Sequence, residues 1–151
     1  MKRLVFLILM MVVTVAAISQ KSIKGYELGE KYKTDDHKET TVFGRKATVV
    51  PLLLNDGRAF SVIASFEDNE RSDMLYLKDK IESVFDVYLI KVDVIDNELY
   101  VDMYRYEATK NGVKYILFIE EDTLNKKYII MMGIVDKNLE KIHNKEIEND
   151  I

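Results

Sequence analysis

Apolar and polar residues alternate at strand spacing along most of the chain and recur at helix spacing in one long segment. Residues 40–66 predict three strands, because turn signals divide the run at Gly44-Arg45 and at Asn55-Asp56-Gly57. The glycine of the second turn supplies the positive φ of a tight hairpin. Pro51 lies inside the second strand. Since proline has no N–H to donate to a sheet ladder, we expect this strand to be an edge or to carry a bulge there.

The helical segment follows a predicted acidic loop at residues 67–71 and covers residues 72–86. The hydroxyl of Ser72 can cap the first helical turn. Charged residues take most of the solvent side, and the apolar residues recur every three or four positions. This spacing predicts an amphipathic helix that lies on a sheet. The apolar positions are Met74, Leu77, Ile81 and Val84.

Four further strands are predicted after this helix, with no second long helix between them, at residues 89–95, 99–107, 113–119 and 128–135. Asp96-Asn97 predicts a turn, and Asn111-Gly112 is the strongest two-residue hairpin signal in the chain. Residues 136–151 are highly charged. They still contain enough apolar positions for a short closing helix, namely Leu139, Ile142 and Ile147.

These elements define the expected fold. Strands that are joined by tight turns pair antiparallel, and such a sheet needs a helix on only one of its faces. We therefore expect an α+β fold with one curved antiparallel sheet of about six to seven strands. The main helix at residues 72–86 packs on one face, and a short helix closes the C-terminus. Residues 39–151 form a single domain with a charged tail, and residues 20–38 form a polar arm or strap.

The N-terminus has the three parts of a secretory signal peptide. Lys2 and Arg3 are followed by an apolar run at residues 4–15 and then by small residues. The run is shorter than the roughly 20 residues that a membrane span needs. Residues 1–19 are therefore predicted to be a signal peptide that is cut after Ser19. A cut after Ala17 and an uncleaved anchor are the alternatives.

The chain contains no cysteine. It therefore has no disulfide, no thiolate nucleophile, no cysteine-bound metal and no lipoprotein anchor. An exported chain without cysteine favours a soluble protein in a bacterial periplasm or outside the cell. Without Lys2 and Arg3, the 22 basic and 26 acidic residues become 20 and 26, which gives a net charge of −6. An acidic domain is a poor partner for a phosphate backbone, so we expect no nucleic acid to bind.

No standard catalytic or cofactor-binding motif is present, which leaves no residue that we assign to catalysis, a metal or a cofactor. The two histidines, His37 and His143, lie in charged segments, where solvated side chains are the expected arrangement. A metal site could combine the imidazole of His37 with a neighbouring aspartate, Asp35 or Asp36. A His–carboxylate pair for general acid–base catalysis would instead need the two distant histidine segments to meet.

A set of aromatic residues gives the candidate partner surface. Tyr100, Tyr104 and Tyr106 share one side of a predicted strand, with Asp102 between them. Tyrosine either covers a core or lines a binding surface, because its ring is apolar and its hydroxyl is polar. If the main helix packs on the opposite face, the tyrosines form an exposed stripe for a protein, a peptide or a glycan. If they face the helix, they belong to the core.

Several short segments resemble small uncharacterised exported proteins of Bacteroides-like bacteria: Gly25-Tyr26-Glu27-Leu28-Gly29, Thr40-Thr41-Val42-Phe43-Gly44, Leu54-Asn55-Asp56-Gly57 and Gly133-Ile134-Val135-Asp136. More loosely, the order of elements is similar to the β-lactamase-inhibitor-like fold of a sheet plus a helix. These segments are turns and strand starts, so the resemblance implies a fold and an exported location but transfers no functional residue.

The sequence thus favours a non-enzymatic binding or interaction module. A small enzyme that uses His37 or His143 is one alternative, and an inhibitor or immunity-like protein is another. The sequence does not determine the oligomeric state.

Overall fold

The structure is a computed structural model that describes residues 21–92 and 101–149. The predicted signal peptide, the predicted turn at Asp96-Asn97 and the side chain of Tyr100 lie outside these residues. Within the described ranges, no helix is long and apolar enough to cross a membrane.

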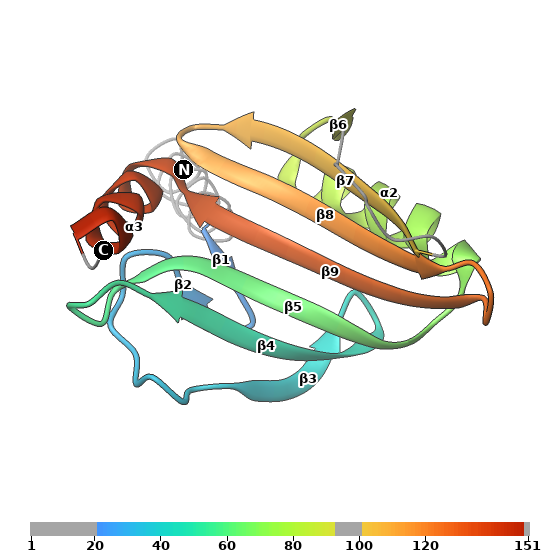
Figure 1. Cartoon of the computed structure of the whole chain (residues 1–151), viewed down its shortest axis with the longest axis horizontal. Helices are drawn as coiled ribbons and strands as arrows, with labels where there is room; N and C mark the ends of the chain where they lie inside the picture. The colour runs from blue at the N-terminus through green and yellow to red at the C-terminus, as the bar shows by residue number, and fades with distance from the viewer. Residues whose placement is uncertain (1–20, 93–100, 150–151) are drawn as a thin grey trace, which may run out of the picture.

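Seven antiparallel strands form one sheet in the spatial order β3-β4-β5-β9-β8-β7-β6 (Figure 1). Their bounds are Lys38–Val42 for β3, Arg45–Leu53 for β4, Ala59–Asn69 for β5, Ile90–Val92 for β6, Val101–Lys110 for β7, Val113–Asp122 for β8 and Lys127–Asp136 for β9. Two helices accompany this sheet in the described part of the chain, α2 at Arg71–Phe85 and α3 at Lys137–Asn149. The predicted α+β class with an antiparallel sheet is confirmed, and so is the hairpin turn at Asn111-Gly112.

Helix α2 contributes its apolar side chains to a core that it shares with the sheet. Leu77, Ile81 and Phe85 are buried, and the Phe85 ring centroid lies 4.9 Å from that of Tyr115 on β8. The Arg45 side chain of β4 forms an ion pair with Asp73, which is almost fully buried near the start of α2. Apolar burial and this ion pair together hold the helix against the sheet.

The N-terminal arm folds back onto the same side of the sheet. Its strands β1, at Ser22–Ile23, and β2, at Tyr26–Glu27, form a small hairpin, and Ile23 enters the core around α2. Two backbone hydrogen bonds tie the arm to the start of β5: Gly29 N donates to Ala59 O (2.8 Å), and Ala59 N donates to Glu30 O (2.8 Å).

Three local predictions need correction. The first turn is centred on Phe43 and Gly44, one residue earlier than predicted. The main helix starts at Arg71, because Asp73 accepts a hydrogen bond from Glu70 N (2.7 Å), and Glu70 rather than Ser72 is therefore the cap. Residues 67–69 continue β5 instead of forming a loop, because Asn69 pairs with Tyr128 at the start of β9.

Pro51 lies in an interior strand, but the structure also explains how a proline fits there. The pairing of β3 with β4 ends at Val49, so Pro51 lies beyond the part of β4 that β3 covers. On the other side, Pro51 is paired with Val62, and the register shifts between Leu52 and Leu53. The strand therefore carries an irregularity next to the proline, although β4 as a whole is not an edge.

Candidate functional site

The predicted site residues Tyr104 and Tyr106 lie on the side of β7 that α2 covers. Both side chains are half-buried and pack against the core. Lys78 of α2 places its Nζ 5.9 Å from the Tyr106 ring centroid, and Lys91 places its Nζ 4.5 Å from that of Tyr104. This is the arrangement that we expected if the tyrosines face the helix. A stripe that includes Tyr100 stays a prediction, since Tyr100 lies outside the described residues.

A cleft of about 130 Å³ brings these tyrosines next to Tyr128 and Glu121. Tyr128 donates a hydrogen bond to Glu121 (2.8 Å), and Tyr104 donates a long one to the exposed Asp102 (3.4 Å). The pKa of Tyr104 is raised by burial and by the charges of Asp102 and Glu121, and the pKa of Tyr128 is raised mainly by its bond to Glu121. These hydroxyls therefore stay protonated near neutral pH and act as hydrogen-bond donors.

The two histidines differ from each other in their surroundings. His37 is exposed, and its Nδ1 lies 3.0 Å from the backbone oxygen of Asp35. His143 is half-buried, because its ring stacks on Phe60 with a centroid distance of 4.1 Å. Among the described residues, no hydrogen bond or ion pair joins either imidazole to a carboxylate, and no group of three potential metal ligands was found.

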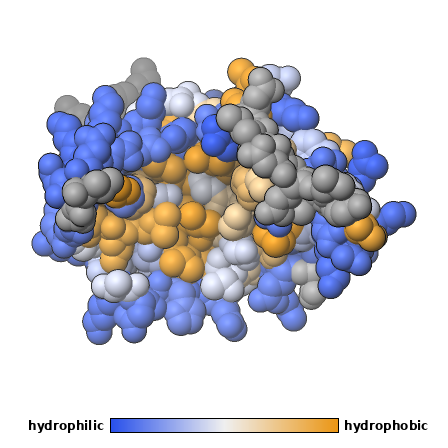
Figure 2. Space-filling model, viewed as in Figure 1, coloured by the Kyte–Doolittle hydropathy of each residue, from blue (hydrophilic) through white to orange (hydrophobic). Residues whose placement is uncertain are grey.

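Of the residues that the structure describes, few cover the side of the seven-stranded sheet that faces away from α2, and we call this side the open face. Helix α3 covers only one end of it, where Leu139 packs with Val135 and Ile116. Figure 2 shows a hydrophobic area in the middle of this face, with hydrophilic residues above and below it. The strand register places the following apolar side chains on it: Val50, Leu52, Ile63, Ile116, Phe118, Ile129, Met131 and Val135.

Gly133 lies near the centre of the open face, on β9 between Ile63 of β5 and Ile116 of β8. Because glycine has no side chain, a depression of about 110 Å³ remains at this position. Its walls are Ser61, Ile63, Ile116, Phe118, Met131 and Val135, and we call it the Gly133 depression. Nearly all of its lining is apolar.

The backbone does not require glycine at this position. Gly133 is outside the positive-φ region, and a Cβ atom built on it would lie 3.8 Å from both Ile63 Cγ1 and Val62 O, which is ordinary van der Waals contact. Glycine inside a strand is unfavourable, and it often marks a place where another group approaches the backbone closely. The depression is thus a feature that the fold tolerates but does not need.

Two ion pairs lie at the border of this surface. Arg105 Nε lies 3.0 Å from Glu107 Oε1, and Lys114 Nζ lies 2.7 Å from Glu140 Oε1. Each of these pairs carries no net charge. The strand register also places Glu120 on this face beside Ile129, and none of the described ion pairs includes Glu120. The centre of the open face is therefore suited to an apolar group.

The Gly133 depression was not predicted from the sequence, although the sequence contains a signal for it. Residues 113–119 and 128–135 are apolar on both alternating sets of positions, whereas an antiparallel strand with one wet face needs only one apolar set. This excess of apolar residues, with a glycine inside it, indicates a second face that is hydrophobic.

The comparisons with known proteins give no relative: no protein-family model, no curated protein and no solved structure shows a significant match to this chain.

Proposed function

We propose that this chain is an exported, non-enzymatic binding module that recognises a protein partner through its open face. The observation that carries the proposal is the uncovered apolar surface around the Gly133 depression. Contiguous apolar patches on monomers are usually small, and larger ones often mark interaction sites. The expected exported location and the lack of catalytic motifs agree with a binding role outside the cytoplasm.

The dimensions of the surface fit a protein partner. Side chains on one face of a strand are about 7 Å apart, and neighbouring strands are about 4.8 Å apart. The eight apolar side chains of the open face therefore cover roughly 300 Å², which can form the apolar centre of an interface of about 800 Å² per partner. The depression of about 110 Å³ is somewhat smaller than a cavity of about 150 Å³ that accepts benzene. Because the depression is open to solvent, it can accept part of one leucine, methionine or phenylalanine side chain.

The border of the surface specifies the chemistry of this partner further. The Arg105–Glu107 and Lys114–Glu140 pairs are each neutral, and the lining of the depression is apolar, so the partner presents an apolar patch with one protruding side chain. Hot spots of interfaces are of this kind, with a bulky side chain in a desolvated pocket. An inhibitor or immunity-like protein would use the same surface, so the identity of the partner distinguishes these two roles.

The experiment uses a phage-displayed library of random 12-residue peptides as the probe. We expect the selected peptides to share one leucine, methionine or phenylalanine, and we expect Gly133→Leu to weaken their binding at least about tenfold, because the new side chain fills the depression. Thr48→Leu is the matched control: it adds the same side chain to the same face outside the depression, and binding should not change.

Two results would contradict the proposal. One is equal binding of the selected peptides by the wild type and by Gly133→Leu. The other is a stable dimer in sedimentation velocity that Gly133→Leu dissociates, because a second copy of the chain would then be the occupant of the open face.

A further inference from the structure

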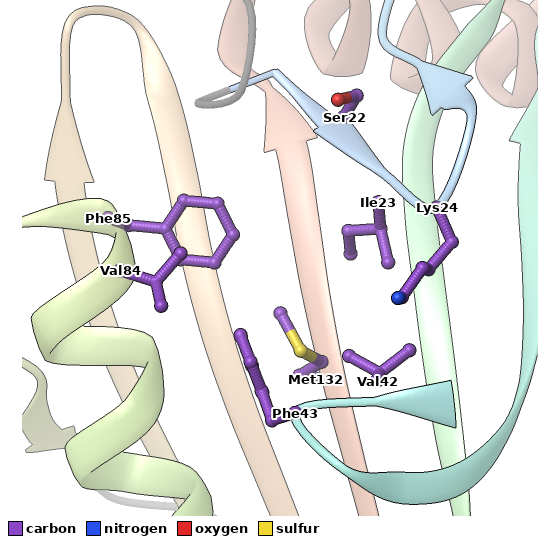
Figure 3. Close-up of a pocket in the computed structure, with 8 residues that line it drawn as sticks. All are labelled: Ser22, Ile23, Lys24, Val42, Phe43, Val84, Phe85 and Met132. Atoms are coloured by element: carbon purple, nitrogen blue, oxygen red, sulfur yellow. The ribbon is translucent and has the colours of Figure 1, made fainter. Parts of the chain in front are cut away.

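A second apolar cavity, of about 270 Å³, lies on the opposite side of the sheet from the Gly133 depression (Figure 3). Val84 and Phe85 reach into it from the end of α2, and Ile23 and Lys24 face them from the β1-β2 hairpin. Met132 of β9 lies between the two walls. The remaining lining residues are Ser22, Val42 and Phe43. We call this space the helix-side cavity.

The walls of the helix-side cavity are apolar and are held in place. Ile23, Val42, Phe85 and Met132 are each at most 4% exposed. The turn that carries Phe43 is fixed to α2, because the Tyr76 hydroxyl donates a hydrogen bond to Phe43 O (2.8 Å). Because these apolar walls are held in place, the cavity stays open and can bind an apolar ligand.

A single charged side chain, that of Lys24, lies at the opening of the cavity. Of the described residues that line it, Lys24 alone carries a charge, and the described ion pairs do not include this lysine. Figure 3 shows the Lys24 side chain extending from the hairpin turn on the side of Ile23 and Val42. An ammonium beside apolar walls complements an anionic group that is attached to an apolar body.

The backbone at this opening favours a different residue. Lys24 and Gly25 form the two-residue turn of the hairpin with φ values of 49° and 94°, and Asn-Gly is the preferred pair for such a turn. Phe43 adopts a φ of 50° in the other turn at the cavity. Two side chains that both contact the cavity are thus held in a left-handed conformation that costs about 1 kcal/mol or more each.

We propose that the helix-side cavity binds a small amphiphile with one acid group, whose carboxylate pairs with Lys24 and whose apolar body lies among Ile23, Phe43, Phe85 and Met132. Since a cavity of about 150 Å³ holds benzene, this cavity has room for an apolar body nearly twice as large, such as an arylalkanoic acid or a fatty acid of about eight carbons. This site is separate from the open face and does not depend on the function proposed above.

Octanoate is the probe for this site, and octylamine and octan-1-ol are its matched controls. We expect octanoate to bind with 1:1 stoichiometry in isothermal titration calorimetry and to raise the Tm, while octylamine binds at least about tenfold more weakly. In a spectrum of the methionine methyl groups, octanoate should shift the signal of Met132. The signal of Met131, which lies on the open face, should stay in place.

Lys24→Asn separates recognition from folding. Asparagine suits the left-handed turn, so the variant should be at least as stable as the wild type, while its affinity for octanoate falls at least about tenfold. Lys21→Asn removes an exposed lysine three residues away and should leave the affinity unchanged. Equal affinities of wild type and Lys24→Asn, equal binding of octanoate and octylamine, or no binding of octanoate at all would each overturn the proposal.

Discussion

Single residues decide what each face of the sheet can do, and Gly133 is the clearest case. It lies in β9, which pairs with β5 on one side and β8 on the other, where a side chain would normally contribute to packing. A Cβ atom would find only ordinary contacts there. The neighbouring residue Met132 belongs to the core around α2. Adjacent residues of β9 therefore lie on opposite faces of the sheet. Strand periodicity predicts this alternation, but it does not show which face is left uncovered.

We predict that Gly133→Ala stabilises the protein. Alanine reduces the conformational freedom of the unfolded chain and adds contacts in the folded state, so the free energy of unfolding should rise by about 0.5–1 kcal/mol in urea titrations. Gly112→Ala is the control, because Gly112 has a φ of 78° that alanine adopts only with strain; this variant should lose stability. If Gly133→Ala were instead clearly destabilising, the fold would require glycine at this position, and the depression would no longer indicate a binding role.

At the scale of elements, local patterns predicted the strands and helices better than their ends. Asn111-Gly112 forms the expected hairpin because an Asn-Gly pair fixes its own turn. The extension of β5 to Asn69 depends instead on Tyr128, which is 59 residues away in the sequence: the Asn69 side chain donates hydrogen bonds to Phe66 O (2.8 Å) and Tyr128 O (3.4 Å). Such contacts exist only after the sheet has formed, so sequence spacing could not predict them.

The candidate sites show the same limit. The alternation of tyrosines along β7 was visible in the sequence, but the face that α2 covers depends on the whole sheet. Lys24 and Phe43 are 19 positions apart and meet at one cavity because two separate hairpin turns pack beside α2. A short sequence motif cannot encode that proximity, because it arises from the packing of elements.

At the junction between α2 and β6, one carboxylate is expected to make the stability of the protein depend on pH. Glu82 Oε1 accepts hydrogen bonds from Lys78 Nζ (2.6 Å) and from Leu89 N (2.8 Å). Burial by itself raises the pKa of Glu82, but these two bonds and the Lys78 charge lower it below the ordinary value of 4.5. At pH values between the lowered pKa of Glu82 in the folded protein and its ordinary pKa in the unfolded chain, the unfolded chain therefore binds more protons than the folded protein. The stabilisation is complete above pH 4.5 and is lost as the pH falls through the lowered pKa.

Glu82→Gln should reduce the free energy of unfolding by about 1 kcal/mol at neutral pH, because the ionised acceptor is replaced by a neutral amide. The difference between wild type and variant should shrink as the pH decreases below about 4.5 in chemical unfolding experiments. Glu148→Gln, in an exposed position of α3, serves as the control and should change stability by less than about 0.5 kcal/mol. A difference that is independent of pH would show that Glu82 acts by packing alone.

At the scale of the whole molecule, the described residues form two distinct apolar surfaces on opposite sides of one sheet. On one side, α2 and the N-terminal arm cover the sheet but leave the helix-side cavity. On the other side, α3 covers only one end, and the Gly133 depression remains open (Figures 1 and 2). Because Met131 and Met132 report on opposite faces, ligand binding to each surface can be measured separately in the same protein. The location of the protein then determines which ligands each surface meets.

The last prediction concerns this location. We expect expression in a Gram-negative host to yield a periplasmic protein that starts at Gln20, because a cationic start, an apolar run and small residues precede that position. Intact-mass measurement of the periplasmic fraction distinguishes this start from Ile18, which a cut after Ala17 would produce. Ala17→Lys should block the cut after Ser19, because the signal peptidase needs a small residue three positions before the bond. A full-length chain that retains Met1 and stays in the cytoplasm would disprove export, and the ligands proposed for both surfaces would then have to be sought inside the cell.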